Sequence, residues 1–193
     1  RVHPAGDDGV PDLLTWLRTQ AGLPSGTAPV QRLDQGTSGL LLAGATPSAR
    51  AAASAWLAEH RVEKTYLTVV HGRARKKGTL RRALPDGRRG RPLPAVTRYR
   101  TLEWLGGFSL LAVQIETGRK HQIRRHLHGI GHPVVGDPRY RRAGRRRVPG
   151  WAGRMWLHAR VLVLPGGETF EDPLPPSLLA SLDAMRAGAA DAP

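Results

Sequence analysis

Residues 95–116 read AVTRYRTLEWLGGFSLLAVQIE, and this stretch decides the fold class. Two runs rich in β-branched and aromatic residues, 95–104 and 108–116, flank the pair Gly106-Gly107. A glycine pair between two such runs is typical of a tight hairpin turn, because glycine tolerates the positive φ angles that these turns need. The stretch therefore predicts an antiparallel β-hairpin.

Further elements are expected on both sides of this hairpin. Periodicity and turn signals predict strands at 39–45, 64–71, 156–164 and 168–171, and helices at 11–21, 48–60, 120–129 and 177–187. Thr46 and Pro47 suit the cap and first position of the second helix. Residues 72–94 and 139–150 are predicted as long basic loops. Because strands mostly follow one another without βαβ alternation, we expect an α+β fold with a mixed, mainly antiparallel sheet flanked by helices and loops.

Composition limits the protein class. The chain has 193 residues, 40% of them hydrophobic, which suits one domain with a real core. It has no cysteine, so disulfides, thiol catalysis and cysteine-bound zinc are excluded. No apolar run approaches the roughly 20 residues that span a bilayer, and the first residues do not resemble a signal peptide. We therefore expect no membrane association and a cytoplasmic location.

The charge points to a polyanionic partner. The formal net charge is +15, and 26 of the 30 basic residues are arginine, which suits contacts to phosphates and bases. Residues 71–100 carry eleven basic residues against one acidic residue, and residues 117–147 carry ten against one. Two such stretches can flank a groove that binds nucleic acid. Two solvated loops are the alternative.

Asp34 is the first candidate for chemistry. It lies in residues 31–40, QRLDQGTSGL, between an arginine and a turn of small residues. No other acidic residue lies between Asp12 and Glu59, so no second carboxylate is near it in sequence. The alternative is that the Asp34 side chain only caps a turn by accepting the N–H group of Gly36 or Thr37.

A second candidate lies at residues 116–126, ETGRKHQIRRH, where a strand ends, a glycine turns the chain and a helix begins. The spacing of His121, Arg124 and His128 predicts that they share a helix face. A basic surface helix is the alternative. Histidines also occur at 126 and 132, but no acidic residue lies among them, so we expect no metal site.

Five ordered segments carry a family resemblance. They are 32–40 (RLDQGTSGL), 64–66 (KTY) followed by Val69, Val70 and Gly72, 117–124 (TGRKHQIR), 131–140 (GHPVVGDPRY) and 157–159 (LHA). In this order they resemble the motifs of the RluA-type pseudouridine synthases, which isomerise uridine in ribosomal or transfer RNA. Five matches in order are far more specific than any one of them.

The resemblance implies a single catalytic domain over residues 1–193 with a central active-site cleft. It implies that Asp34 is the essential carboxylate, that Tyr66 stacks on the target base and that Arg124 pairs with Asp34. Side chains implied to contact RNA are Arg32, Arg119, Lys120, His121 and Arg125.

The implied reaction suits these residues. It breaks the N1–C1′ bond, rotates the uracil and rejoins it through C5, so it needs no metal, redox cofactor or activated donor. One ionised carboxylate can act as nucleophile or as base at the sugar, and a nearby arginine favours the ionised form of a buried carboxylate. The base must leave its stack to be reached and can then lie on an aromatic ring.

Three departures from the family pattern stand out. Gln31 replaces the usual histidine, for which we expect changed contacts and not lost chemistry. Only Val2-His3-Pro4 remains of the usual first strand, and we expect no S4-like RNA-binding domain. These departures leave a catalytically silent RNA-binding protein of the same fold as the alternative function.

Overall fold

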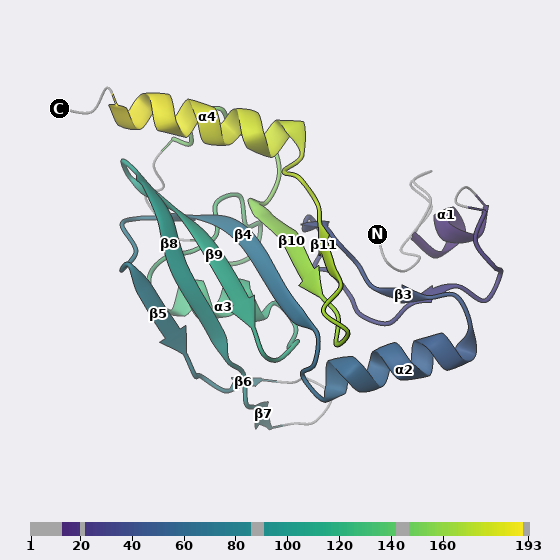
Figure 1. Cartoon of the computed structure of the whole chain (residues 1–193). Helices are drawn as coiled ribbons and strands as arrows, with labels where there is room; N and C mark the ends of the chain where they lie inside the picture. The colour runs from purple at the N-terminus through teal and green to yellow at the C-terminus, as the bar shows by residue number, and fades with distance from the viewer. Residues whose placement is uncertain (1–12, 20–21, 86–90, 142–146, 191–193) are drawn as a thin grey trace.

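The computed structural model describes residues 13–19, 22–85, 91–141 and 147–190, and its centre is a seven-stranded sheet (Figure 1). The strand order is β11-β10-β4-β9-β8-β5, and β2 pairs with β10 beside this path. The sheet strands are β2 (Ser38–Gly39), β4 (Glu63–His71), β5 (Lys77–Leu80), β8 (Thr97–Leu105), β9 (Phe108–Ile115), β10 (Leu157–Val163) and β11 (Thr169–Glu171). Only β2 and β10 run parallel, so the predicted mixed, mainly antiparallel sheet is confirmed.

Four helices lie within the described residues. They are α1 (Leu13–Thr19), α2 (Pro47–Ala58), α3 (Gln122–Gly129) and α4 (Pro176–Ala190). The Thr46 hydroxyl caps α2 by accepting the N–H group of Ala49 at 3.1 Å, as predicted. Figure 1 shows α4 across one end of the sheet and α3 behind the central strands. The region of Val2-His3-Pro4 and the basic run 142–146 lie outside the described residues.

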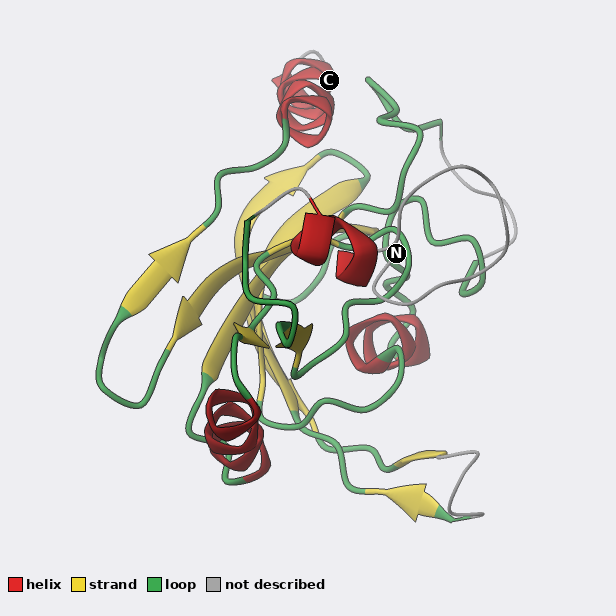
Figure 2. Ribbon diagram, turned by 90° about the vertical axis from the view of Figure 1, so that its right-hand side faces the viewer, coloured by secondary structure: helices red, strands yellow, loops and turns green. Residues whose placement is uncertain are grey.

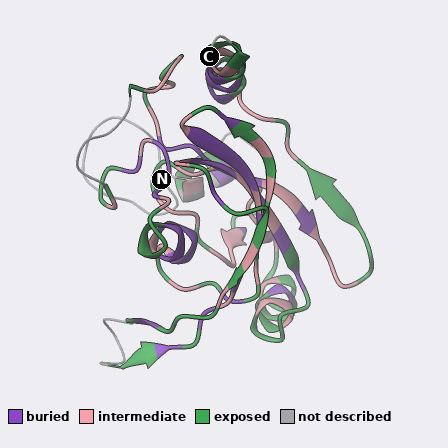
Figure 3. Ribbon diagram, turned by 90° about the vertical axis from the view of Figure 1, so that its left-hand side faces the viewer, coloured by how far each residue is buried: buried purple, intermediate pink, exposed green. Residues whose placement is uncertain are grey.

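The sheet separates two hydrophobic cores, because side chains alternate between its faces. On one face, Tyr66 and Val70 pack with Leu111 and with Ile123 and Leu127, which come from α3. On the other face, a second cluster joins the sheet to α4; it contains Val69, Phe108, Leu110, Leu178, Leu182 and Met185. Figure 3 shows the buried residues concentrated on the central strands. The active-site candidates lie on the α3 face.

The predicted hairpin is confirmed, whereas the predicted long loop at 72–94 is wrong. Leu105 pairs with Phe108 across the two glycines. Within 72–94, β5 pairs with the edge of β8, and β6 (Leu84–Pro85) pairs with β7 (Pro92–Leu93). A Cβ atom at Gly78 would lie 2.6 Å from the Tyr99 ring, so glycine lets β5 approach β8. Figure 2 shows the β6–β7 arm extending away from the main sheet.

The predicted strand at 39–45 is also wrong in part. This range overlaps two short strands and not one: β2, which pairs with β10 in the main sheet, and β3 (Ala43–Gly44), which pairs with β1 (Ala28–Pro29) outside it. The chain turns at Gly39, which has φ of 105° and lies so close to the Ala159 backbone that no Cβ atom fits. In the described ranges, no helix is long and apolar enough to cross a membrane.

Candidate active site

Asp34 lies in a tight turn between β1 and β2. Its backbone carbonyl closes the turn by accepting the N–H group of Thr37 at 2.9 Å, and Gly36 supplies a φ of 87°. The side chain is therefore not required to cap the turn. Its carboxylate, 24% exposed, instead faces the residues around the start of α3.

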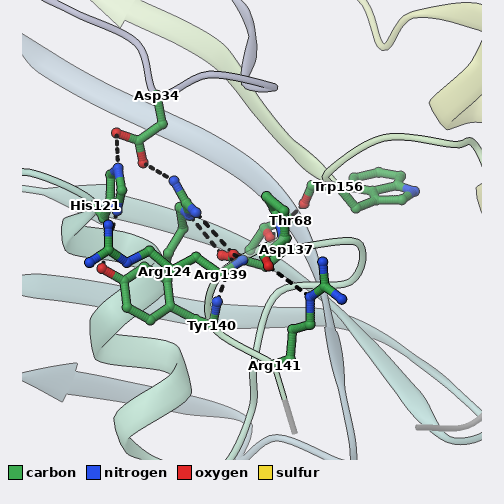
Figure 4. A network of polar contacts seen from close by, with 10 residues as sticks. Asp34, Thr68, His121, Arg124, Asp137, Arg139, Tyr140, Arg141 and Trp156 are labelled. Carbon is green, nitrogen blue, oxygen red and sulfur yellow. Dashed lines mark hydrogen bonds and ion pairs between the residues drawn. The ribbon is translucent and has the colours of Figure 1, made fainter.

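Arg124 connects two carboxylates (Figure 4). Its Nη1 donates to Asp34 Oδ2 at 3.2 Å, while Nε and Nη2 donate to the two oxygens of Asp137 at 2.7 and 2.9 Å. The Arg124 side chain is only 4% exposed. Burial acts to lower the pKa of Arg124, but its hydrogen bonds and charge interactions with Asp137 and Asp34 outweigh burial and raise it. The predicted pairing of Asp34 with Arg124 is present.

Asp137 fixes the position of Arg124, and this role was not predicted from the sequence. Its side chain is fully buried, and Oδ1 also accepts the backbone N–H groups of Arg139 and Tyr140 at 2.8 and 2.9 Å. Burial acts to raise the pKa of Asp137, but these hydrogen bonds and that of Arg124 outweigh it and lower the pKa. The sequence feature that could have pointed to this role is that Asp137 is the single acidic residue within the basic stretch 117–147.

His121 lies beside Asp34 but not on α3, so the predicted shared helix face is wrong for it. The residue precedes the helix in the left-handed conformation, with φ of 56°. Its Nδ1 atom lies 3.1 Å from the Tyr140 hydroxyl, and Nε2 lies 3.9 Å from Asp34 Oδ1. Burial lowers the pKa of His121 against the opposing charge of Asp34. A neutral imidazole therefore flanks the carboxylate at neutral pH.

Asp34 and Tyr66 line one cavity of about 380 Å³. Tyr66 is 8% exposed and projects from the α3 face of β4. Burial, with a smaller effect of the Asp34 charge, raises the pKa of Tyr66 to about 12, so its phenol is neutral at neutral pH. A wider depression of about 790 Å³ elsewhere is lined by residues such as His71, Val148 and Trp151, and no described residue of its lining carries a carboxylate.

Three of the five predicted RNA-binding residues line this cavity. They are Arg32, Arg119 and His121. Arg119 Nε donates to the Pro94 carbonyl at 3.2 Å, which places it beside the base of the β6–β7 arm. Lys120 is exposed, and Arg125 donates to the Pro85 carbonyl in the arm at 3.1 Å. Neither Lys120 nor Arg125 lines the cavity.

Metal ligands do not gather at this site. Within the part of the chain that the structure describes, no three His, Asp or Glu side chains come together in a group that could hold a metal ion. The donors around Asp34 are instead cationic or neutral nitrogen atoms, which suit an anion or a polar organic ligand.

Replacing Asp137 with alanine is expected to destabilise the protein by about 3–5 kcal/mol, because it leaves the buried Arg124 charge without its main partner. The loss is measured as the free energy of unfolding in urea at pH 7. Since the folded-state pKa of Asp137 is lowered, its contribution is complete above the ordinary value of about 3.9 and is lost as pH falls through the folded value. The difference in the free energy of unfolding between wild type and Asp137→Ala should therefore shrink in acid.

Asp183→Ala, at an exposed site on α4, is the matched control. An Asp137→Ala protein as stable as this control would contradict the assigned role.

Comparison with known proteins gives a consistent result. Residues 2–129 match the family model described as RNA pseudouridylate synthase. An uncharacterized RNA pseudouridine synthase of Chloroflexus aurantiacus is 43% identical over 70% of this chain and 44% of its own length. Ribosomal large subunit pseudouridine synthase D of Nitrosomonas europaea is 36% identical over 96% of this chain and 60% of its own length. The chain thus spans about half of the length of these curated relatives.

A solved structure matches nearly the whole chain. Human RNA Pseudouridylate Synthase Domain Containing 1 superposes with a TM-score of 0.70 at 30% identity, covering 94% of this chain and 86% of that chain. The likeness therefore extends beyond the segment that the family model matches.

Proposed function

Because this chain belongs to the RNA pseudouridylate synthase family, and to its RluA type, we propose that it isomerises uridine to pseudouridine in structured RNA, either ribosomal or transfer RNA. The observation that carries the proposal is the contact of Asp34 with Arg124 at a cavity that Tyr66 also lines. This arrangement combines a charged carboxylate, a cation that orients it and an aromatic ring.

Asp34 acts at the sugar in this proposal, either as a nucleophile or as a base. The N1–C1′ bond breaks, the uracil rotates, and a C5–C1′ bond forms. The proton on C5 leaves, and N1 gains one, so the reaction is an isomerisation with no net change in atoms. Arg124 holds Asp34 in place, and Asp137 holds Arg124.

Tyr66 receives the extruded base on its ring. A uridine within an RNA helix is inaccessible, so it must be flipped out and stacked against an aromatic side chain. The cavity of about 380 Å³ is of a size for one nucleoside. Exposed basic residues hold the RNA backbone in this proposal; they are Arg32, Lys120, Arg81, Arg82 and Arg91.

We further propose that the described residues act as one catalytic domain, since the central sheet includes strands from residue 38 to residue 171. A cytoplasmic location remains a prediction.

The test is release of tritium from bulk cellular RNA labelled at uridine C5 and taken from a strain that lacks this gene. With enzyme in excess and nothing else added, wild-type protein is expected to release tritium into water, because forming the C5–C1′ bond expels the C5 hydrogen. Separate ribosomal and transfer RNA fractions identify the substrate class. Salt-sensitive RNA binding without any release would instead support the silent RNA-binding protein.

A further inference from the structure

Lys64 is a buried cation that the mechanism above does not use. It lies on β4, is 7% exposed and lines the same cavity as Asp34 and Tyr66. Among the described residues, none forms a hydrogen bond or ion pair with its ammonium group. Burial lowers the pKa of Lys64, and no charged partner opposes that effect. An ammonium group on a buried side chain that has no partner among the described residues is unfavourable unless water or a ligand supplies one.

The position of Lys64 beside Tyr66 indicates which part of a nucleotide reaches it. Lys64 and Tyr66 project from the same face of β4, about 7 Å apart along the strand. They line the same cavity and are 7% and 8% exposed, whereas Arg32 on this cavity is exposed. An RNA strand continues on both sides of the target nucleotide, so its phosphates stay near the exposed residues of the cavity. The base that stacks on Tyr66 is therefore the part that lies beside Lys64.

We propose that Lys64 donates a hydrogen bond to the uracil carbonyl oxygen that lies farthest from the sugar. This inference rests on the proposed function. In uridine, which is attached through N1, that oxygen is O4. In pseudouridine, which is attached through C5, the oxygen opposite the sugar is O2. Rotation of the detached ring exchanges these two oxygens, so one ammonium group has an acceptor before and after the reaction.

The proposed contact strengthens when the glycosidic bond breaks. The uracil then carries the electron pair of the N1–C1′ bond, and its negative charge is shared with O2 and O4. A fixed cation at this charge in a water-poor cavity stabilises the detached base more than the bound uridine. Two residues of the same cavity lining, Gln31 and Thr37, each carry a side-chain atom (Nε2 and Oγ1) that is buried without a hydrogen-bond partner in the described structure.

The first test compares Lys64→Met with wild type in single-turnover tritium release from the bulk RNA described above. The rate is expected to fall about 10²–10³-fold, while RNA affinity from filter binding stays within about twofold. The melting temperature should be unchanged or higher, because methionine removes a buried charge.

Two further variants test the contribution of the charge. Lys64→Gln, which keeps an N–H donor without the charge, should have an intermediate rate. Glu63→Met, an exposed neighbour on the other face of β4, is the control and should keep the wild-type rate. A Lys64→Met protein with the wild-type rate would overturn the proposal.

A binding measurement separates a base contact from a phosphate contact and does not depend on turnover. Wild type should bind pseudouridine 5′-monophosphate about tenfold or more tightly than ribose 5-phosphate, as a charge-assisted hydrogen bond allows. In Lys64→Met this preference should largely disappear. An equal loss of affinity for both ligands would show that Lys64 holds the phosphate, and would overturn the inference. If wild type releases no tritium, the proposed function fails, and the base preference still decides the role of Lys64.

Discussion

Asp34→Asn is expected to release no tritium from uridine-labelled RNA, which corresponds to a loss of about 10⁴-fold or more in the single-turnover rate. Asparagine keeps nearly the shape of aspartate and can still accept the hydrogen bond from Arg124 Nη1. It lacks the negative charge and the oxygen nucleophile, so it can neither attack the sugar nor remove a proton. The measurement uses enzyme in excess over the same bulk RNA.

The variant should keep its fold and its affinity for RNA. The Asp34 carboxylate is partly solvent-exposed, so loss of its ion pair should change the free energy of unfolding by about 1 kcal/mol or less. Asp183→Asn on α4 makes the same chemical change at an exposed site far along the chain, and it should match wild type in rate. Isomerisation by a pure Asp34→Asn protein would rule out the assigned role.

Arg124→Lys is expected to slow the reaction by about 10²–10³-fold, although it conserves the charge. The arginine uses three nitrogen atoms on two carboxylates, with Nε and Nη2 on Asp137 and Nη1 on Asp34. A lysine side chain has one nitrogen atom, which cannot donate to both carboxylates with the planar geometry of a guanidinium. We expect it to remain with the fully buried Asp137 and to leave Asp34 unsupported. Single-turnover rates measure the effect.

Two further measurements distinguish positioning from general destabilisation. Arg61→Lys, at an exposed ion pair with Glu59, is the matched control and should have the wild-type rate. Arg124→Lys should also bind RNA as wild type does, since the Arg124 side chain is only 4% exposed. A rate within twofold of wild type would show that Asp34 needs no support from Arg124, whereas weakened RNA binding would assign Arg124 to the substrate instead.

The sequence predicts most of the sheet because its central strands have strong local signals. The β8–β9 hairpin is specified by two β-branched runs and a glycine pair, and β4 by its own composition. The β5–β7 region was missed because its glycine, proline and arginine residues are typical of loops. β5 forms by pairing with β8, where Gly78 fits against Tyr99, and β6 and β7 pair with each other. These pairings are tertiary effects.

For the site, too, the sequence motifs predict some contacts, and others depend on how distant segments pack. The motif resemblance implies that Asp34, Tyr66 and Arg124 act together. The structure brings Asp34 and Arg124 into contact across 90 positions of sequence, and Asp34 and Tyr66 line one cavity. The motifs could not show that Asp137 binds the same Arg124 guanidinium as Asp34, because that contact depends on the turn after Gly136. They also could not show that Lys64 has no partner among the described residues, since this depends on how the cavity is packed.

The two-residue strand β2 has a consequence for how the proposed activity would be lost. The segment that carries Asp34 joins the main sheet through the two residues of β2 and a few further hydrogen bonds, among them Leu40 N to the Ala159 carbonyl and Ser38 Oγ with His158 Nδ1, both at 3.0 Å. Strands β4, β8 and β9 share far longer ladders. Local opening of so short a ladder requires less free energy than global unfolding. Heat or denaturant can therefore separate the carboxylate from its arginine in molecules whose sheet is intact, and inactivation then precedes melting.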